Sequence, residues 1–315
     1  MSNELAHDFS PLIKIYKDGR IERLTGTTTL PPSLDPQTRV ESKDVVISKE
    51  PALSARLYLP TKSTTNSPNN KLPLLVYIHG GGFVVEHASS SIYHNYLNAL
   101  VAETNIVAVS VEYRLAPEYS LPAAYDDAWG SLKWVASHSD GKGSEDWLNR
   151  HADFQRVFIA GDSAGANIAH NVGLRVGSEG LGGVKPKGIV LVHPYFGGSE
   201  AIGAEQALPP VVREYMVGLW RLAYPSTSGS DDPLFNPGKD PKLGGLGCEK
   251  VLVCVAEKDA LKDRGWNYSE VLKKSGWKGA VDVIESKGEN HVFHLFNPTC
   301  DNAVALLKKM VSFIN

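Results

Sequence analysis

The chain has 315 residues, a formal net charge of −3 and 42% hydrophobic residues. A chain of this size and composition can bury one large core, and a single α/β domain over residues 1–315 is predicted. The near balance of acidic and basic residues gives no reason to expect a nucleic acid or an anionic membrane as partner. Its cysteines, Cys248, Cys254 and Cys300, lack the spacing of a zinc site or a disulfide framework.

The N-terminal segment bears on where the protein is expected in the cell. Residues 1–20 are polar and mixed in charge, without the basic start and apolar stretch of a secretory signal. No run in the sequence is long and apolar enough to span a bilayer. A reducing compartment also suits the sparse cysteines, so the sequence predicts a cytoplasmic protein without membrane contact.

Short apolar runs alternate with amphipathic segments along the chain. Most of the runs are continuously apolar, as in strands buried on both faces of a parallel sheet. The alternation predicts a doubly wound, mostly parallel α/β sheet with helices on both faces. The predicted strands are 55–59, 72–79, 106–113, 156–160, 188–193, 250–256 and 281–285, and the predicted helices are 91–103, 122–138, 164–175, 264–275 and 299–313.

Two stretches interrupt this alternation. Residues 1–50 are rich in Pro, Thr and Asp, and residues 197–246 contain a helical run, 210–224, between Gly- and Pro-rich loops. Each could be a linker, but a cap over the carboxyl ends of the strands is favoured, because a linker would not need their large apolar residues. These residues are Ile13, Ile15, Tyr16, Tyr215, Met216, Leu219 and Trp220. Residues 62–71 are predicted to form an exposed loop.

A pentapeptide with a central serine follows the strand predicted at 156–160. It is Gly161-Asp162-Ser163-Ala164-Gly165, a G-x-S-x-G pattern placed between a strand and a helix. The serine of such a turn stands clear of the sheet, and glycines at both flanks allow strand and helix to approach closely. The pattern predicts Ser163 as a nucleophile, although the pentapeptide alone is short enough to occur by chance.

A glycine run at the end of the strand predicted at 72–79 complements this serine. His79 is followed by Gly80, Gly81 and Gly82, which can expose backbone amides to a developing oxyanion. The expected donors are the amides of Gly81, Gly82 and Ala164. His79 is expected to hold the loop rather than to act as a base.

A serine nucleophile needs a histidine base and an acid that orients it. In folds with this strand–serine–helix turn, the three residues follow the chain order Ser, Asp, His. His291 comes after the last predicted strand, and His294 is the alternative. Asp259 comes after the strand at 250–256, and the alternative Asp263 has helix capping as its other role.

With these residues identified, the sequence resembles the plant carboxylesterases of the hormone-sensitive-lipase-like branch of α/β-hydrolases. The resemblance runs from about Ile13 to the C-terminus and includes the blocks H-G-G-G-F, Y-R-L-A-P-E, P-A-A-Y-D-D and G-D-S-A-G-A-N. It implies a cap, short-acyl or aromatic ester substrates, and no metal or organic cofactor. Arg114, Glu118 and Asp126 lie in these blocks and are interpreted as scaffolding beside the site.

The resemblance leaves three functions open. The first is hydrolysis of a small-molecule ester through a covalent acyl-enzyme. The second is a dehydratase, eliminase or cyclase of plant specialised metabolism, since the sequence is similar to the 2-hydroxyisoflavanone dehydratases of legumes. The third is a hormone receptor on the same scaffold, which the retained His291 disfavours. We expect a monomer or weak homodimer, with a substrate pocket walled by Phe83, Val84, Tyr195, Tyr215, Leu219 and Phe293.

Overall fold

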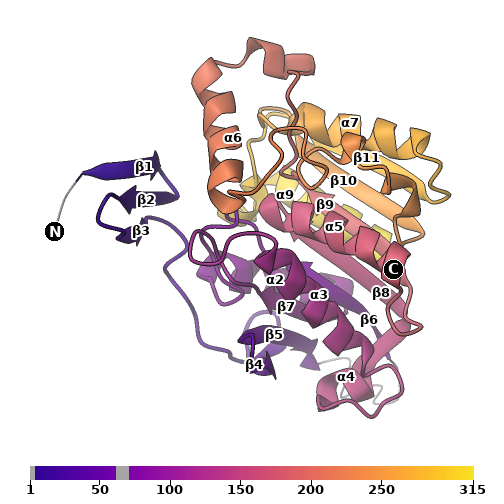
Figure 1. Ribbon diagram of the computed structural model, residues 1–315. Helices are drawn as coiled ribbons and strands as arrows, with labels where there is room; N and C mark the ends of the chain where they lie inside the picture. Colours follow the sequence, from indigo (N-terminus) through magenta and orange to yellow (C-terminus); the bar gives the residue numbers. More distant parts are fainter. Residues whose placement is uncertain (1–3, 62–70) are drawn as a thin grey trace.

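An eight-stranded sheet in the order β11-β10-β9-β8-β6-β7-β5-β4 forms the centre of the protein (Figure 1). The computed structural model describes residues 4–61 and 71–315. Neighbouring strands from β7 to β11 are parallel, whereas β5 and β4 continue the sheet in antiparallel pairs. The strands are β4 (Val40–Ser48), β5 (Leu53–Pro60), β6 (Leu72–Ile78), β7 (Val107–Glu112), β8 (Ala152–Asp162), β9 (Pro186–Val192), β10 (Lys250–Ala256) and β11 (Ala280–Ser286).

Helices cover both faces of this sheet, because its central strands are apolar on both sides. Alternate residues of β6 enter different cores: Leu74 and Val76 belong to one, and Leu75 and Tyr77 to the other. The first core lies under α3 (Ala123–Ala136), α5 (Ala164–Glu179) and α7 (Lys262–Lys274), and the second under α2 (Ser91–Thr104) and α9 (Asp301–Ile314). The predicted doubly wound α/β architecture is confirmed.

The predicted extent of the N-terminal cap was too long. Its last part is strand β4, which pairs with β5 along the main sheet. The strand escaped prediction because it forms the sheet edge and alternates buried with exposed residues, including Lys43 and Asp44, instead of being apolar throughout. The short helix α4 (Asp146–His151) was also not predicted. Most of the predicted loop, residues 62–70, lies outside the described residues.

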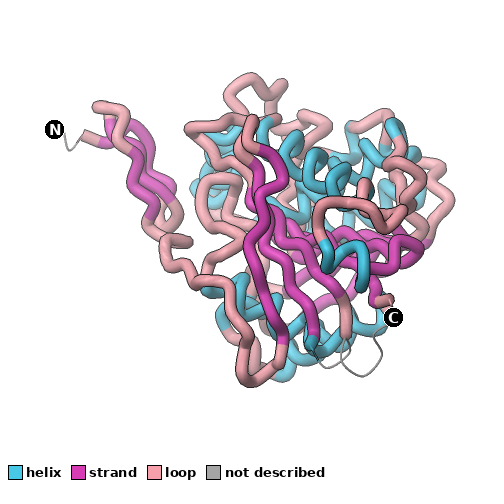
Figure 2. The backbone as a smooth tube through the Cα atoms, turned by 90° about the horizontal axis from the view of Figure 1, so that it is seen from below, coloured by secondary structure: helices cyan, strands magenta, loops and turns pink. Residues whose placement is uncertain are grey.

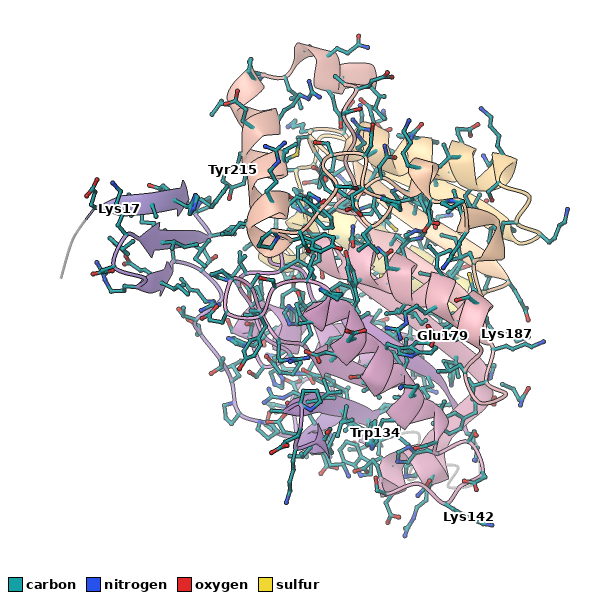
Figure 3. The ribbon with its side chains drawn as sticks, in the orientation of Figure 1. Lys17, Trp134, Lys142, Glu179, Lys187 and Tyr215 are labelled. Atoms are coloured by element: carbon teal, nitrogen blue, oxygen red, sulfur yellow. The ribbon has the colours of Figure 1, made fainter. Side chains whose placement is uncertain are left out.

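A separate three-stranded antiparallel sheet precedes β4. It comprises β1 (Leu5–Phe9), β2 (Ile13–Tyr16) and β3 (Ile21–Arg23), and it projects from the body beside α6 (Pro210–Ala223) (Figures 1 and 2). From α6, Tyr215 lies on the side of the helix that faces these strands (Figure 3), and its hydroxyl donates to Phe9 O at 3.1 Å. At the end of β3, the Arg23 guanidinium donates to Val84 O at 2.7 Å. The N-terminal strands therefore contact both α6 and the loop that contains Gly80, Gly81 and Gly82, near Val84.

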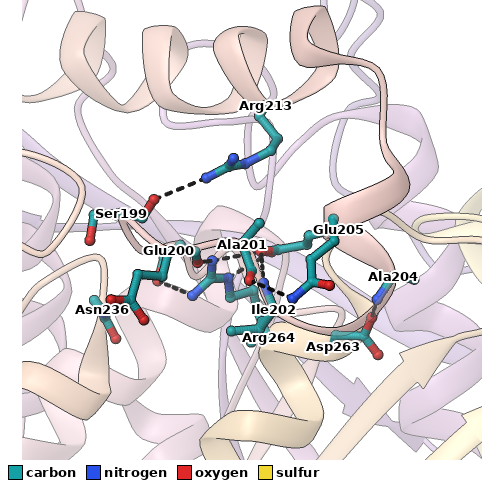
Figure 4. Close-up of polar contacts among 12 residues, drawn as sticks. Ser199, Glu200, Ala201, Ile202, Ala204, Glu205, Arg213, Asn236, Asp263 and Arg264 are labelled. Atoms are coloured by element: carbon teal, nitrogen blue, oxygen red, sulfur yellow. Dashed lines mark hydrogen bonds and ion pairs between the residues drawn. The ribbon is translucent and has the colours of Figure 1, made fainter.

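The stretch 197–246 is fastened to the main body by a buried ion pair. It contains η1 (Gly203–Ala207), α6, η2 (Pro237–Lys239) and η3 (Leu243–Gly245). Arg264, at the start of α7, contacts the Glu205 carboxylate at 2.6 Å and also donates to Glu200 O and Gly197 O (Figure 4). Such a pair resists disruption, since removing one partner leaves the other charge buried and unpaired. The part of the stretch 197–246 that precedes α6 is thereby held against α7, the helix that follows Asp259.

Candidate active site

Ser163 occupies a sharp turn between β8 and α5. Its backbone has φ 51° and ψ −119°, a conformation that costs energy for a residue with a Cβ and that recurs at functional sites. The flanking glycines are required sterically: a Cβ at Gly161 would lie 2.4 Å from the Gly165 carbonyl carbon, and one at Gly165 would lie 2.1 Å from Ile78 O. The Ser163 amide donates to Val192 O at 2.8 Å, which anchors the turn to β9. The strained turn carries Ser163 into the wall of a cavity.

The predicted base and acid lie within hydrogen-bonding distance of this serine. His291 Nε2 is 2.9 Å from Ser163 Oγ, and His291 Nδ1 is 2.7 Å from Asp259 Oδ2. The second oxygen of Asp259 accepts from the Leu261 amide at 2.9 Å, so the carboxylate is held from two sides. These residues follow β8, β10 and β11, whose carboxyl ends meet at one edge of the sheet. The geometry is that of a nucleophile, a base and an orienting acid.

Electrostatics couple the two ionisable partners. Burial alone would raise the pKa of Asp259 and lower that of His291. The charge of each partner and the hydrogen bond between them outweigh burial, so the pKa of Asp259 is lowered and the pKa of His291 is raised. Asp259 is 3% exposed and His291 35%, so the imidazole keeps an open side toward the cavity while its acid does not.

The alternative base and acid lie elsewhere. His294 is buried against the Tyr96 ring, with ring centroids 5.0 Å apart, and neither of its nitrogens has a hydrogen-bond partner among the described residues. Burial lowers the pKa of His294 well below its ordinary value. Asp263 lies in the first turn of α7 and accepts from the Ala204 amide at 2.6 Å (Figure 4). Its carboxylate therefore ties the 197–246 stretch to α7.

The glycine run after β6 forms a tight loop beside Ser163. Gly81 and Gly82 have φ of 99° and 61°, which glycine adopts without strain. His79 stacks on Tyr113 with centroids 4.2 Å apart, and its Nδ1 lies 2.8 Å from Gly80 O, as expected for a residue that holds the loop. The amides of Gly81, Gly82 and Ala164 donate to no other group in the described part of the chain. Gly81 and Gly82 line the cavity that Ser163 faces, whereas Ala164 is fully buried.

A buried network that sequence reasoning missed supports this loop. Asp162 accepts from the hydroxyls of Tyr77 and Tyr93, each at 2.8 Å. The Tyr93 hydroxyl in turn accepts from the Gly80 amide at 2.8 Å, linking the residue before the nucleophile to the glycine loop. Burial raises the pKa of Asp162 to about 6, although both tyrosine hydrogen bonds oppose the increase. No sequence signal pointed to the tyrosines, which come from β6 and α2.

Ser163, Asp259 and His291 line a cavity of about 720 Å³. Its walls come from the N-terminal stretch, the glycine loop, α6 and the segments after β10 and β11. A volume of this size is typical of small-molecule sites. Of the predicted wall residues, Tyr195, Tyr215 and Leu219 line the cavity.

Three of the predicted wall residues were wrong. Phe83 and Val84 are fully buried behind the glycine loop, where Phe83 packs against Tyr195 and Trp220. Phe293 is also buried, with its ring against His193. The prediction assumed that residues next to site residues in the sequence would face the cavity. Such a residue often points away from the site into the core.

One group of side chains has the spacing of a metal site. Ligand atoms of His193, Asp259 and His291 all lie within 4.8 Å of one another. However, His291 Nδ1 is bonded to Asp259, and His193 Nδ1 accepts from the Val292 amide at 2.8 Å. A metal bound between His291 Nδ1 and Asp259 would break their hydrogen bond, so the observed contacts favour the hydrogen-bonded line from Ser163 to Asp259. Within residues 4–61 and 71–315, no helix is both long and apolar enough to cross a membrane.

Comparison with known proteins agrees with this geometry. Residues 75–295 match the protein family described as alpha/beta hydrolase fold. The chain belongs to the α/β-hydrolase family. This α/β hydrolase is 50% identical over 317 residues to Probable carboxylesterase 5 of Arabidopsis thaliana, covering 100% of this chain and 99% of that protein. The predicted fold family and the predicted similarity to plant carboxylesterases are confirmed.

Two further similarities are informative. The α/β hydrolase is 45% identical over 328 residues to 2-hydroxyisoflavanone dehydratase of Glycyrrhiza echinata, covering 99% of this chain and 97% of that protein. The crystal structure of EstE1, a thermostable carboxylesterase from a metagenomic library, superposes with a TM-score of 0.71 and 31% identity, covering 87% of this chain and 88% of that one. The relatives thus carry names of both hydrolytic and dehydrating enzymes.

Proposed function

We propose that this α/β hydrolase is a carboxylesterase that cleaves small-molecule esters through an acyl-enzyme. The observation that carries the proposal is the continuous hydrogen-bonded line from Ser163 Oγ through the His291 ring to Asp259. Ser163 attacks the ester carbonyl, and His291 takes its proton and passes it to the leaving alcohol. Water then attacks the acyl-enzyme with His291 again as base, which restores the free serine.

The glycine loop stabilises the negative charge that develops on the substrate oxygen in this reaction. As the carbonyl carbon becomes tetrahedral, its oxygen gains negative charge, and preorganised amides stabilise that charge. The amides of Gly81, Gly82 and Ala164 suit this role because no described protein group competes for them. The N-terminus of α5, which begins at Ala164, adds its positive dipole end at the same point.

We further propose that the N-terminal stretch and α6 act as a cap that determines which esters enter. Leu12 and Leu24 from the first and Leu219 from the second line the same cavity. These apolar walls suit a short acyl chain or an aromatic ring.

A dehydratase is the second candidate, supported by the 45% identity to 2-hydroxyisoflavanone dehydratase. The same base could abstract a proton from carbon, and the same amides could stabilise an enolate. Elimination needs no nucleophile, whereas here Ser163 lies 2.9 Å from the imidazole in a strained turn. That arrangement favours hydrolysis.

The two candidates differ in whether an acyl group becomes attached to the protein. We expect the purified protein to release p-nitrophenol from p-nitrophenyl acetate and butyrate, and a fluorophosphonate probe to label one equivalent of protein at Ser163. Mass spectrometry of the labelled peptide identifies the site. Conversion of a 2-hydroxyisoflavanone by loss of water, with no ester turnover and no adduct, would support the dehydratase instead.

The pH profile should report the base. His291 must be neutral to accept the serine proton, so protonation at low pH abolishes activity. Because Asp259 raises the pKa of His291, we expect kcat/KM to fall on acidification with a midpoint above the ordinary histidine value of 6.5. The measurement uses a neutral ester across about pH 5–9, with enzyme stability checked at each pH. An acid limb with its midpoint below 6.5 would contradict the assignment.

A further inference from the structure

Glu86 is a buried acid in the wall of the proposed active-site cavity. Its side chain is 9% exposed, and its backbone has φ 75°, an unusual conformation for a residue with a Cβ. Two glycines make room for it: a Cβ at Gly26 would lie 2.9 Å from Glu86 Cδ, and one at Gly81 would lie 3.1 Å from Glu86 Cγ. The carboxyl group is therefore held between the N-terminal stretch and the glycine loop.

No cation of the described chain neutralises this carboxyl group. Ser90 and the charge of His87 act to lower its pKa, and the His87 ring is itself bonded to Glu112 at 2.7 Å. Of the cationic residues in the cavity wall, His291 pairs with Asp259, and Lys258 forms no ion pair with Glu86. Burial raises the pKa of Glu86 above its ordinary value. A largely buried carboxyl group that faces a cavity without a counter-charge is stabilised by a polar ligand that bonds to it.

Its position next to Gly81 also bears on catalysis. An ionised carboxylate there would oppose the negative charge that the proposed hydrolysis develops on the substrate oxygen. A substrate hydroxyl bonded to Glu86 would offset that effect. A hydroxyl suits the site because it can donate to the carboxyl group in either protonation state and can also accept from the protonated form. An ammonium group can only donate, and it forms an ion pair only with the ionised carboxylate.

We propose that Glu86 is a specificity-determining residue that binds a hydroxyl group of the substrate, so that the preferred substrates are hydroxylated, for example phenolic, esters. The inference rests on the proposed ester hydrolysis for its kinetic test. It predicts selection among esters by a polar group near the reacting carbonyl, in a cavity whose other walls include Leu12, Ile92 and Leu219.

The test compares matched esters that differ by one ring hydroxyl. Phenyl acetate and its ring-hydroxylated forms vary the alcohol side, and ethyl dihydrocinnamate and its ring-hydroxylated forms vary the acyl side. We expect wild-type kcat/KM to favour at least one hydroxylated ester over its parent by about tenfold or more, as for a hydrogen bond to a charged group. In Glu86→Leu this ratio should fall to about one, and Glu86→Gln, whose amide can still bond, should retain part of it. Each ratio is taken within one variant, so a general change in activity cancels.

Thr28→Val is the matched control, since Thr28 lines the same cavity and the variant leaves the carboxyl group in place. It should keep the wild-type ratio. The inference is also tested by calorimetry, which measures the binding of dihydrocinnamamide and its ring-hydroxylated forms to the wild-type protein. This measurement needs neither turnover nor a folded Glu86 variant. We expect tighter binding of a hydroxylated amide.

The inference would be overturned if the wild-type protein showed equal kcat/KM for hydroxylated and parent esters and bound hydroxylated and parent amides equally. A hydroxyl preference that survives in Glu86→Leu, or a preference confined to amine-bearing analogues, would also overturn it. Lack of turnover of every ester would instead count against the proposed hydrolysis, while the amide binding would still decide the role of Glu86.

Discussion

Replacing Ser163 with alanine is expected to lower kcat for p-nitrophenyl butyrate by about 10³-fold or more. The variant lacks the Ser163 hydroxyl, whose oxygen lies 2.9 Å from His291 Nε2, so no acyl-enzyme can form by the proposed route. The residual rate would come from the amides of the glycine loop and from substrate binding. Fluorophosphonate labelling should disappear in the same variant, and alanine should relieve none of the backbone strain, because it also carries a Cβ.

Ser178→Ala provides the matched control for this loss. Ser178 lies on the same helix, α5, but near its other end, where its hydroxyl bonds to Leu174 O at 3.1 Å. Its kcat should stay within about threefold of wild type, since surface substitutions have small effects. Thermal unfolding of both variants checks that the fold is kept. Full esterase activity in folded Ser163→Ala would remove the proposed nucleophile.

Replacing Asp259 with asparagine is expected to lower kcat by about 10⁴-fold while leaving the fold intact. The carboxylate accepts a hydrogen bond from the Nδ1–H of His291, which leaves Nε2 free to accept the serine proton. An amide can turn its NH₂ group toward Nδ1 and so favour the opposite tautomer, in which Nε2 carries the proton and faces Ser163 as a donor. The loss of the negative charge also removes stabilisation of the imidazolium that forms during the reaction.

Asp263→Asn is the control that separates the loss of kcat in Asp259→Asn from the effect of removing any negative charge near α7. Asp263 accepts from the Ala204 amide, and an asparagine oxygen can accept the same hydrogen bond. We therefore expect kcat within about threefold of wild type. Steady-state kinetics and the rate of fluorophosphonate labelling are measured for both variants. A larger loss in Asp263→Asn than in Asp259→Asn would reverse the assignment of the acid.

Local sequence patterns were enough to predict the features that depend on local backbone chemistry. The turn at Ser163 needs glycines at 161 and 165 because strand, turn and helix are consecutive in the chain, and the steric conflict lies among neighbouring segments. The order of Ser163, Asp259 and His291 followed from the order of the strands that precede them. Continuous apolar runs likewise predicted the central strands, whereas the half-exposed edge strand β4 lacked that signal.

The surroundings of Ser163, Asp259 and His291 depend on how distant elements pack against one another. The tyrosines that hold Asp162, the carboxyl group of Glu86 beside Gly81, and the withdrawal of Phe83 from the cavity all depend on contacts between elements far apart in the chain. Whether a loop side chain points into a cavity or into the core is set by the space its neighbours leave, and close packing makes that space a property of the whole fold. For this protein, the hydrogen-bonded line of Ser163, His291 and Asp259 could be predicted from local patterns, whereas only part of the cavity wall could.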